Sequence, residues 1–143
     1  MTRDAAFADL LDRSYAALLG RPLVPAGQDK TPWLYDAPSA LLAHDTSADP
    51  LFTYANRAAQ RLFGYDWDEF VGLPSRLSAG DEDRGSRQEF LDTVARQGYA
   101  EHYRGRRVAK DGRVFWIEDV TLWNLTRDDG SPAGQAALIR RWS

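Results

Sequence analysis

The residue types that carry most enzyme chemistry are sparse in this sequence. It contains no cysteine, which excludes disulfides, thiolate metal sites and cysteine nucleophiles. The two histidines, His44 and His102, lie far apart and belong to no paired metal-ligand motif. Ser75 and Ser78 have no neighbouring histidine to activate them, and the sequence has no GxSxG, GxxxxGKS or GxGxxG motif. We therefore do not expect an enzyme, and no residue is a candidate for catalysis.

Two groups of carboxylates are candidates for acid–base or metal chemistry. Glu118 and Asp119 are adjacent on a predicted strand, so they face opposite sides and cannot act as a pair on one substrate. The run Asp81-Glu82-Asp83 is typical of a solvated loop and helix start, with weak calcium binding as the alternative. Neither group predicts a metal site.

One basic cluster extends from His102 to Arg107 and is followed by Lys110 and Arg113. Nucleic-acid binding would favour such a patch with aromatic residues between the charges. The alternative is an ordinary solvated strand edge, which the net charge of −3 favours. We therefore expect no nucleic-acid partner.

Length and composition indicate one folded domain. The chain has 143 residues, of which 43% are hydrophobic and 12% aromatic, which suits a real core and argues against disorder. The N-terminal sequence MTRDAAFADLLDRSY interrupts its apolar residues with Asp and Arg, so it resembles neither a signal peptide nor a membrane span. We expect a cytoplasmic protein with no membrane contact.

The clearest local signals lie in the stretch LFTYANRAAQRLFGYDWDEFVG. A strand signal over residues 51–54 leads to Asn56, whose side chain is suited to cap the helix that follows. Gly64 can adopt the left-handed conformation that ends such a helix. Asp66 and Glu69 then have the spacing of a capping box, which predicts a second short helix.

The N-terminal residues predict an amphipathic helix over 4–19, because apolar residues recur there every three or four positions. One interpretation is that this stripe packs on its own domain. The other is that it binds a second copy of the chain or another protein, through the candidate interface residues Phe7, Leu11, Tyr15 and Leu18. The prolines in residues 21–38 predict an extended connector rather than a helix. This divides the chain into a helix and connector over 1–38 and a domain over 39–143.

The rest of the chain predicts strands and helices in a definite order. A capping box from Ser86 to Glu89 begins a helix that ends at Gly98, and Asp111-Gly112 is a strong hairpin signal. The predicted strands are 39–44, 51–54, 99–109, 114–125 and 135–142. Two strands before the helices and three after them predict an α+β fold, with five antiparallel strands and the helices on one face.

The predicted strand 114–125 is apolar on both faces. One row contains Val114, Trp116, Glu118, Val120 and Leu122, and the other contains Phe115, Ile117, Asp119, Thr121 and Trp123. A strand in an antiparallel sheet normally has one solvated face, so two apolar faces indicate that both are covered. The middle helices can cover one face and the N-terminal helix the other.

The stretch around Asn56 resembles the front half of a PAS domain, in which a strand running into Tyr-x-Asn-x-x is followed by a helix that closes on Leu-Phe-Gly-Tyr. Other pieces resemble the PAS-related MEKHLA family, namely Tyr54-Ala55-Asn56-Arg57-Ala58-Ala59, Leu73-Pro74-Ser75-Arg76-Leu77, Gly112-Arg113 with Phe115 and Ile117-Glu118, Trp123-Asn124-Leu125 and Gly134-Gln135-Ala136. The resemblance covers residues 8 to 142. It implies a PAS-like fold, and the order of strands and helices predicted above is the order that PAS domains have.

Similarity to PAS domains places the Phe115 row on the concave side of the sheet, together with Arg107 from the neighbouring strand. Buried charges need a partner or a ligand. One alternative is therefore an internal Arg107–Asp119 salt bridge without a ligand. The other is that both residues bind the polar end of a small molecule in an aromatic-lined cavity. The candidate ligand-binding residues are Asn56, Phe63, Arg76, Phe90, Tyr103, Arg107, Phe115, Ile117, Asp119 and Trp123.

The resemblance also limits the cofactors that we expect, although it leaves the ligand unidentified. PAS haem sensors usually bind iron through a histidine of the helix that corresponds to residues 86–97, and none occurs there. The light-sensing group forms its flavin adduct through a cysteine, which this chain lacks. The first functional hypothesis is a sensory or regulatory module that binds a small molecule and signals through its sheet and N-terminal helix. The alternative is a dimerisation or protein-interaction module with a filled core.

The MEKHLA family also occurs as the C-terminal part of plant homeodomain–leucine-zipper regulators, which implies a role in regulation or partner binding. This chain contains neither a homeodomain nor a zipper, so the resemblance implies no DNA-binding role for it.

Overall fold

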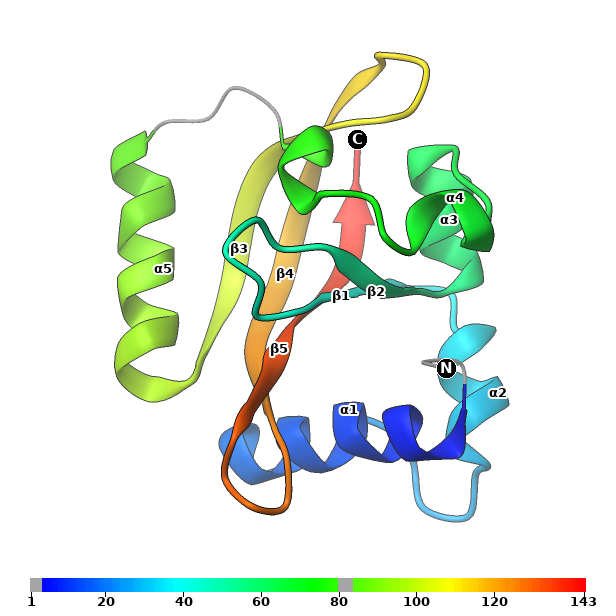
Figure 1. The fold of residues 1–143 in the computed structure, drawn as a ribbon, viewed down its shortest axis with the longest axis vertical. Coiled ribbons are helices and arrows are strands. Elements are labelled where there is room, and N and C mark those ends of the chain that lie inside the picture. The colour runs from blue at the N-terminus through cyan, green and yellow to red at the C-terminus, as the bar shows by residue number, and fades with distance from the viewer. Residues whose placement is uncertain (1–3, 80–83) are drawn as a thin grey trace.

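The computed structural model describes residues 4–79 and 84–143. The elements are α1 (Ala5–Leu19), α2 (Lys30–Tyr35), β1 (Ala40–His44), β2 (Phe52–Ala55), α3 (Arg57–Phe63), α4 (Trp67–Phe70), a 3₁₀ turn η1 (Ser75–Ser78), α5 (Arg84–Gln97), β3 (Tyr99–Val108), β4 (Val114–Thr126) and β5 (Pro132–Trp142). The strands form one antiparallel sheet in the order β2-β1-β5-β4-β3 (Figure 1). The predicted five-stranded antiparallel α+β fold is confirmed.

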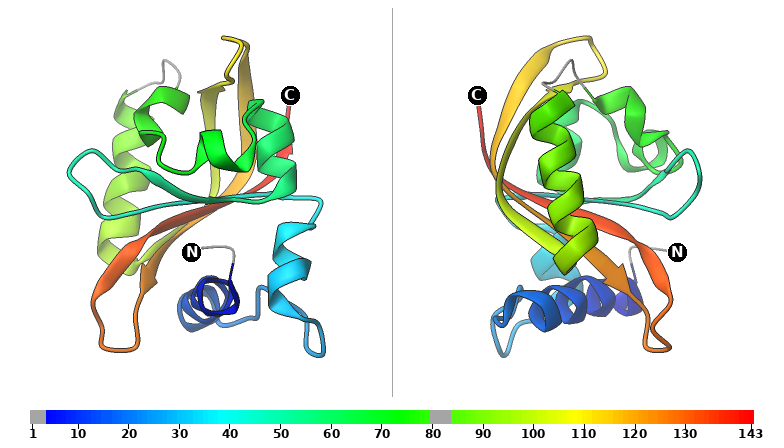
Figure 2. Two further views of the ribbon diagram at one scale, coloured as in Figure 1. Left: turned by 45° about the vertical axis from the view of Figure 1, so that its right-hand side comes forward. Right: turned by 90° about the vertical axis from the view of Figure 1, so that its left-hand side faces the viewer.

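Two hydrophobic clusters lie on opposite sides of the sheet. The first joins the sheet to α3 and α4, and it includes the buried rings of Phe63 and Phe70. The second joins the sheet to α1 and α2, and it includes Leu11 and Trp123. Figure 2 shows α1 crossing the end of the sheet that carries the β4–β5 turn, while α5 runs beside β3. The expected cover by the N-terminal helix is therefore present.

The segment around Asn56 folds as predicted. The Asn56 carboxamide oxygen accepts a hydrogen bond from the Ala59 N–H at 3.0 Å and caps α3. Gly64 has a φ of 80° and ends this helix in the left-handed conformation. Asp66 and Glu69 form the predicted capping box, with bonds of 2.8 and 3.2 Å between side chain and backbone. These local bonds fix the chain between β2 and η1.

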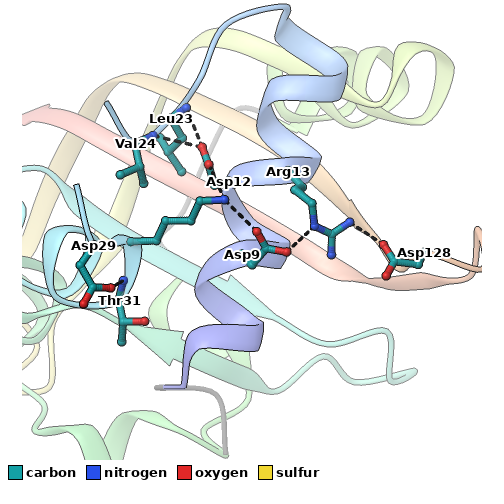
Figure 3. Close-up of polar contacts among 9 residues, drawn as sticks. Asp9, Asp12, Arg13, Leu23, Val24, Asp29, Thr31 and Asp128 are labelled. Carbon is teal, nitrogen blue, oxygen red and sulfur yellow. Dashed lines mark hydrogen bonds and ion pairs between the residues drawn. The ribbon is translucent and has the colours of Figure 1, made fainter. Parts of the chain in front are cut away.

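A polar cluster attaches the connector to α1 (Figure 3). One carboxylate oxygen of Asp12 accepts hydrogen bonds from the backbone N–H groups of Leu23 and Val24, at 2.9 and 3.1 Å. The Lys30 ammonium lies 2.7 Å from Asp9 and 2.9 Å from the second oxygen of Asp12. The buried Asp12 carboxylate is thus hydrogen-bonded and ion-paired, which offsets the cost of its removal from water.

The connector contains a helix that the sequence analysis did not predict. Residues Lys30–Tyr35 form α2, although Pro32 argued for an extended segment. Pro32 lies in the first turn, where backbone N–H groups have no partner within the helix, so its missing N–H removes no bond. Asp29 caps this turn by accepting from the Thr31 N–H at 3.4 Å.

Helix α5 begins at Arg84, two residues before the predicted start. The predicted capping contact of Ser86 depends on a side chain that lies outside what the structure describes. The run Asp81-Glu82-Asp83 also lies outside the described residues, so the calcium alternative is not tested.

The predicted alternation along β4 is wrong in its second half. Phe115 and Ile117 face the helices α3 and α4 as expected, but Val120 and Leu122 also lie on this side. Trp123 faces α1 instead. Asp119 has a φ of 51° and His102, on β3, has a φ of 62°, and the β3–β4 register shifts beside them. Left-handed residues interrupt the regular pleat, and the side-chain alternation reverses there.

Gly134 is required where β5 passes the end of β1. It has a φ of 134°, and a Cβ atom at this position would lie 2.0 Å from the His44 carbonyl oxygen. Only glycine allows this close approach of two backbones.

Candidate ligand-binding cavity

A cavity of about 390 Å³ lies between the sheet and the helical segments η1 and α5. All five strands and both of these helical segments contribute to its wall. The lining residues are Leu42, Ala43, His44, Pro50, Phe52, Ser75, Arg76, Ser78, Ala79, Phe90, Leu91, Tyr103, Arg107, Ile117, Leu122, Gln135, Ala136, Ala137 and Ile139. This volume lies in the range of small-molecule sites, which are mostly apolar with a few polar groups.

Strand β3 brings the main polar groups to the cavity. Tyr103, Gly105 and Arg107 alternate onto the inner side of this strand, and Gly105 has no side chain to separate the other two. Arg107 Nη2 donates to the Tyr103 hydroxyl at 3.4 Å, and Nη1 donates to the Arg106 carbonyl at 2.6 Å. The edge of the Phe90 ring packs against Tyr103, with ring centroids 4.8 Å apart. The guanidinium therefore lies beside an aromatic wall.

Further polar groups of the cavity wall come from η1 and β1. Arg76 is exposed and pairs with Asp49 at 3.2 Å. Ser78 Oγ donates to the Ser75 carbonyl at 2.9 Å. The Nδ1 atom of His44 lies 3.0 Å from the Asp45 carbonyl oxygen, to which a protonated Nδ1 donates.

The structure brings half of the predicted ligand-binding residues together at the cavity. These are Arg76, Phe90, Tyr103, Arg107 and Ile117. Each of them lies on β3, β4, η1 or α5, the elements that surround this part of the cavity. The prediction that Arg107 points to the concave side agrees with this placement.

Asn56 does not line the cavity and has a structural role. It is fully buried, and its oxygen accepts from the Leu41 N–H at 2.9 Å in addition to the helix N–H. Its amide nitrogen donates to the carbonyl oxygens of Leu34 and Ser39, at 3.0 and 2.9 Å. The side chain thus joins α2, β1 and α3, with each of its polar atoms bonded within the chain.

Phe63 and Phe115 also lie outside the cavity wall. Their rings pack edge to face in the core, with centroids 5.2 Å apart, and Phe63 packs on Phe70 in the same way at 5.6 Å. Trp123 lies on the other side of the sheet, where its ring contacts Tyr15 of α1 at 5.0 Å. The reversal at Asp119 explains the displacement of Trp123 from the predicted row.

The predicted Arg107–Asp119 salt bridge does not form. The β3–β4 register places Arg107 opposite Phe115, four positions along the strand from Asp119. Asp119 instead bonds to His102, whose Nδ1 atom lies 2.8 Å from its carboxylate. This hydrogen bond from His102 lowers the pKa of Asp119 below its ordinary value.

Several lining residues were missed in the sequence analysis because the faces of β1 and β5 were not assigned. Gln135, Ala137 and Ile139 alternate along β5, and Leu42 and His44 alternate along β1. This period of two is visible in the sequence and would have given each strand a cavity-facing row.

The candidate interface residues of α1 pack within the chain. Leu11 and Tyr15 are buried against the sheet, and Phe7 and Leu18 are partly buried in the same cluster. The interpretation that the stripe packs on its own domain is the one that the structure supports. An interface built on these side chains would require α1 to leave the sheet.

Two further properties concern only the part of the chain that the structure describes. There, no group of three or more His, Asp or Glu side chains lies close enough to hold a metal ion. Within residues 4–79 and 84–143, no helix combines the length and hydropathy that a membrane crossing requires.

Comparisons with known proteins agree with this architecture. The model of the MEKHLA domain matches residues 5–143. A search of curated proteins gives no match. A solved PAS domain from Colwellia psychrerythraea has a TM-score of 0.64 and 18% identity, and the alignment covers 78% of this chain and 92% of that one.

Two light-oxygen-voltage structures are also similar. An RNA-binding light-oxygen-voltage receptor has a TM-score of 0.63 and 26% identity over 82% of this chain, which spans only 36% of the receptor. The light-oxygen-voltage domain of a blue-light activated histidine kinase from Erythrobacter litoralis has a TM-score of 0.59 and 22% identity, covering 71% of this chain and 93% of that domain. These similarities show a shared fold.

Proposed function

The chain belongs to the MEKHLA domain family and has a PAS-like fold, and on this premise we propose that it is a sensory or regulatory module that binds a small molecule. The observation that carries the proposal is the cavity of about 390 Å³ between sheet and helices. Its walls combine apolar side chains such as Phe52 and Ile139 with the polar Tyr103 and Arg107. Such a mixture provides both the apolar contact area and the orientation that small-molecule binding needs. The proposal is for a binding module and not for an enzyme.

Strand β4 offers a route from the cavity to the N-terminal helix. Leu122 lines the cavity, and the next residue, Trp123, packs on Tyr15 of α1. Consecutive residues of a strand face opposite sides, so a shift of β4 on ligand binding moves both contacts. We propose that α1 communicates ligand occupancy to a partner protein or to a second copy of the chain.

Native mass spectrometry of the freshly purified chain tests ligand binding directly. The expected result is a mass excess that disappears on denaturation and identifies the retained molecule. Ala137→Leu adds a branched side chain to the cavity wall and should reduce retention, whereas the same change at the exposed Ala17 of α1 should not. Retention that is equal in both variants would contradict the assignment of the site to this cavity.

Hydrogen exchange tests the signalling route. Removal of the retained ligand should increase exchange of the α1 amides as well as those of β4. A change confined to the residues around the cavity would contradict transmission through α1.

The alternative function is a protein-interaction module without a ligand, and one surface feature favours it. Val114 and Trp142 are exposed by 57% and 42%, and they border a surface hollow of about 400 Å³ with Leu62 and Phe115. Exposed apolar groups that gather at one place are typical of protein contacts. A stable dimer in native mass spectra, lost on Trp142→Glu and unaffected by Ala137→Leu, would support this alternative over a ligand sensor.

A further inference from the structure

Part of the basic cluster of β3 lies on the outer side of the sheet, away from α3, α4 and the cavity. Gly105 is buried opposite Ile117, which faces these helices. Arg104 and Arg106, on either side of Gly105, therefore project from the outer side. Trp116 precedes Ile117 on β4, so its ring lies on the outer side as well, and it is the register neighbour of Arg106. We call Arg104, Arg106 and Trp116 the β3–β4 patch.

Both guanidinium groups of the patch lie against the indole ring. The Cζ atom of Arg104 is 3.7 Å from the centroid of the Trp116 ring, and that of Arg106 is 5.0 Å from it. Cation–π attraction holds the two side chains in place. Both arginines are exposed, so the N–H donors at the edge of each guanidinium still face solvent. Donors that are held in position in this way lose less conformational freedom when they bind a partner.

The positive charges of the patch are not compensated within the part of the chain that the structure describes. Arg57 and Arg76 each form a salt bridge with an aspartate, whereas Arg104 and Arg106 form none with any described carboxylate. Two like charges beside one ring repel each other. A negative group that bonds to both guanidinium groups would relieve this repulsion, so the patch favours an anionic partner.

The surroundings of the patch favour an acidic protein segment over a nucleic acid. Glu118 lies in the same outer row of β4 as Trp116, and the whole chain carries a net charge of −3. These negative charges interrupt the positive stripe that a phosphate backbone requires. Val114, two residues before Trp116 in this row, is 57% exposed and offers an apolar contact for a protein side chain.

From these observations we propose that the β3–β4 patch binds an extended acidic segment of a partner protein, in which carboxylates occupy alternate positions. Arg104 and Arg106 are two positions apart on a strand, which separates them by about 6.5 Å. Alternate residues of an extended partner segment repeat at the same distance, so each guanidinium can bind one carboxylate. The inference goes beyond the proposed function, because it requires no ligand in the cavity.

A second copy of the chain suits this patch less well. A two-fold contact centred on the patch would bring Arg104 and Arg106 against the same residues of the other copy, and like charges repel. Figure 1 shows α1 beside the β4–β5 turn, at the opposite end of the sheet from the β3–β4 turn. The patch therefore lies on a part of the outer face that α1 leaves uncovered.

Fluorescence anisotropy of labelled peptides with the full chain tests the inference. At low ionic strength, the peptide Gly-Glu-Ser-Glu-Ser-Glu-Leu should bind at least about tenfold more tightly than the peptide with Gln in place of each Glu, because charge-assisted hydrogen bonds are the stronger ones. Arg104→Gln combined with Arg106→Gln should abolish this preference. Arg96→Gln combined with Arg127→Gln removes two exposed charges outside the patch, and this matched control should change the affinity by less than about twofold.

Charge reversal separates recognition from a loss of folding. Arg104→Glu combined with Arg106→Glu should bind the peptide Gly-Lys-Ser-Lys-Ser-Lys-Leu more tightly than the acidic peptide, which an unfolded variant would not do. Circular dichroism and thermal melting establish that each variant is folded.

The inference is wrong if the acidic and amide peptides bind equally, if the control variant loses as much affinity as the patch variant, or if the chain binds none of the peptides. Tighter binding of a single-stranded oligothymidylate, lost in the patch variant, would assign the patch to nucleic acid instead. A dimer in native mass spectra that Arg104→Gln with Arg106→Gln dissociates would assign it to a second copy. None of these results bears on ligand retention in the cavity, so this inference and the proposed function fail separately.

Discussion

Replacement of Asn56 by alanine should strongly destabilise the fold, because this side chain joins the three segments α2, β1 and α3. Its oxygen and nitrogen make four hydrogen bonds to backbone groups, of which those to Leu41, Ala59 and Leu34 are buried. Each buried group left without a partner costs about 1–3 kcal/mol, and water can replace the fourth bond, to Ser39. For three such groups we expect a loss of at least about 3 kcal/mol, a large part of the roughly 5–15 kcal/mol of a typical domain.

Equilibrium unfolding in urea, followed by tryptophan fluorescence, measures this loss as a change in midpoint at constant slope. Asn124→Ala is the matched control, since Asn124 is partly buried and accepts one side-chain bond from Gln135 at 3.3 Å, and it should cost at most about 1 kcal/mol. Asn56→Asp keeps the acceptor and loses both donor bonds, so it should also destabilise. If Asn56→Ala costs no more than the control, the structural role assigned to this residue is wrong.

Three further predictions concern the packing of the chain. Gly134→Ala should destabilise by about 3 kcal/mol or more, because the new Cβ atom meets the β1 backbone, whereas Gly130→Ala, with a φ of 86° and open space around it, should cost only about 1–2 kcal/mol of strain; urea unfolding compares them. The hydrogen bond from Lys30 lowers the pKa of Asp9. The stabilisation of the fold by this pair is therefore present at neutral pH and is lost as the pH falls through the lowered pKa of Asp9. The difference in unfolding free energy between wild type and Lys30→Met should accordingly become smaller in acid. Leu11→Asp should unfold the chain rather than only dissociate a dimer, since Leu11 is fully buried, and circular dichroism together with native mass spectrometry separates these outcomes.

The sequence predicts those parts of the fold that depend on neighbouring residues. The cap at Asn56, the capping box of Asp66 and Glu69, and the turn at Gly112 depend on residues no more than four positions apart, and each is confirmed. The order of strands and helices follows from the same local patterns. The arrangement of these elements in space was predicted from the family resemblance, because local sequence patterns carry no information about it.

The candidate site was predicted only in part because it depends on strand register. Arg107 and Asp119 were paired on the assumption of a uniform alternation, and the actual register separates them. Asn56 was correctly predicted as a cap, and burial of the whole side chain then excludes contact with a ligand. At Pro32 the local pattern was misleading, because proline usually breaks a helix but is tolerated in the first turn, where it lies in α2.

The left-handed conformation at Asp119 explains why the cavity exists. If the alternation that begins at Phe115 had continued, Trp123 would project into the space that Leu122 now borders, and its larger indole would occupy much of that space. A left-handed residue other than glycine costs about 1–2 kcal/mol, so two of them facing each other need a compensating interaction. The exposed bond between His102 and Asp119, at 2.8 Å, offsets part of this cost. Neither residue is among the described lining residues of the cavity, yet both determine which side chains of β4 form its wall.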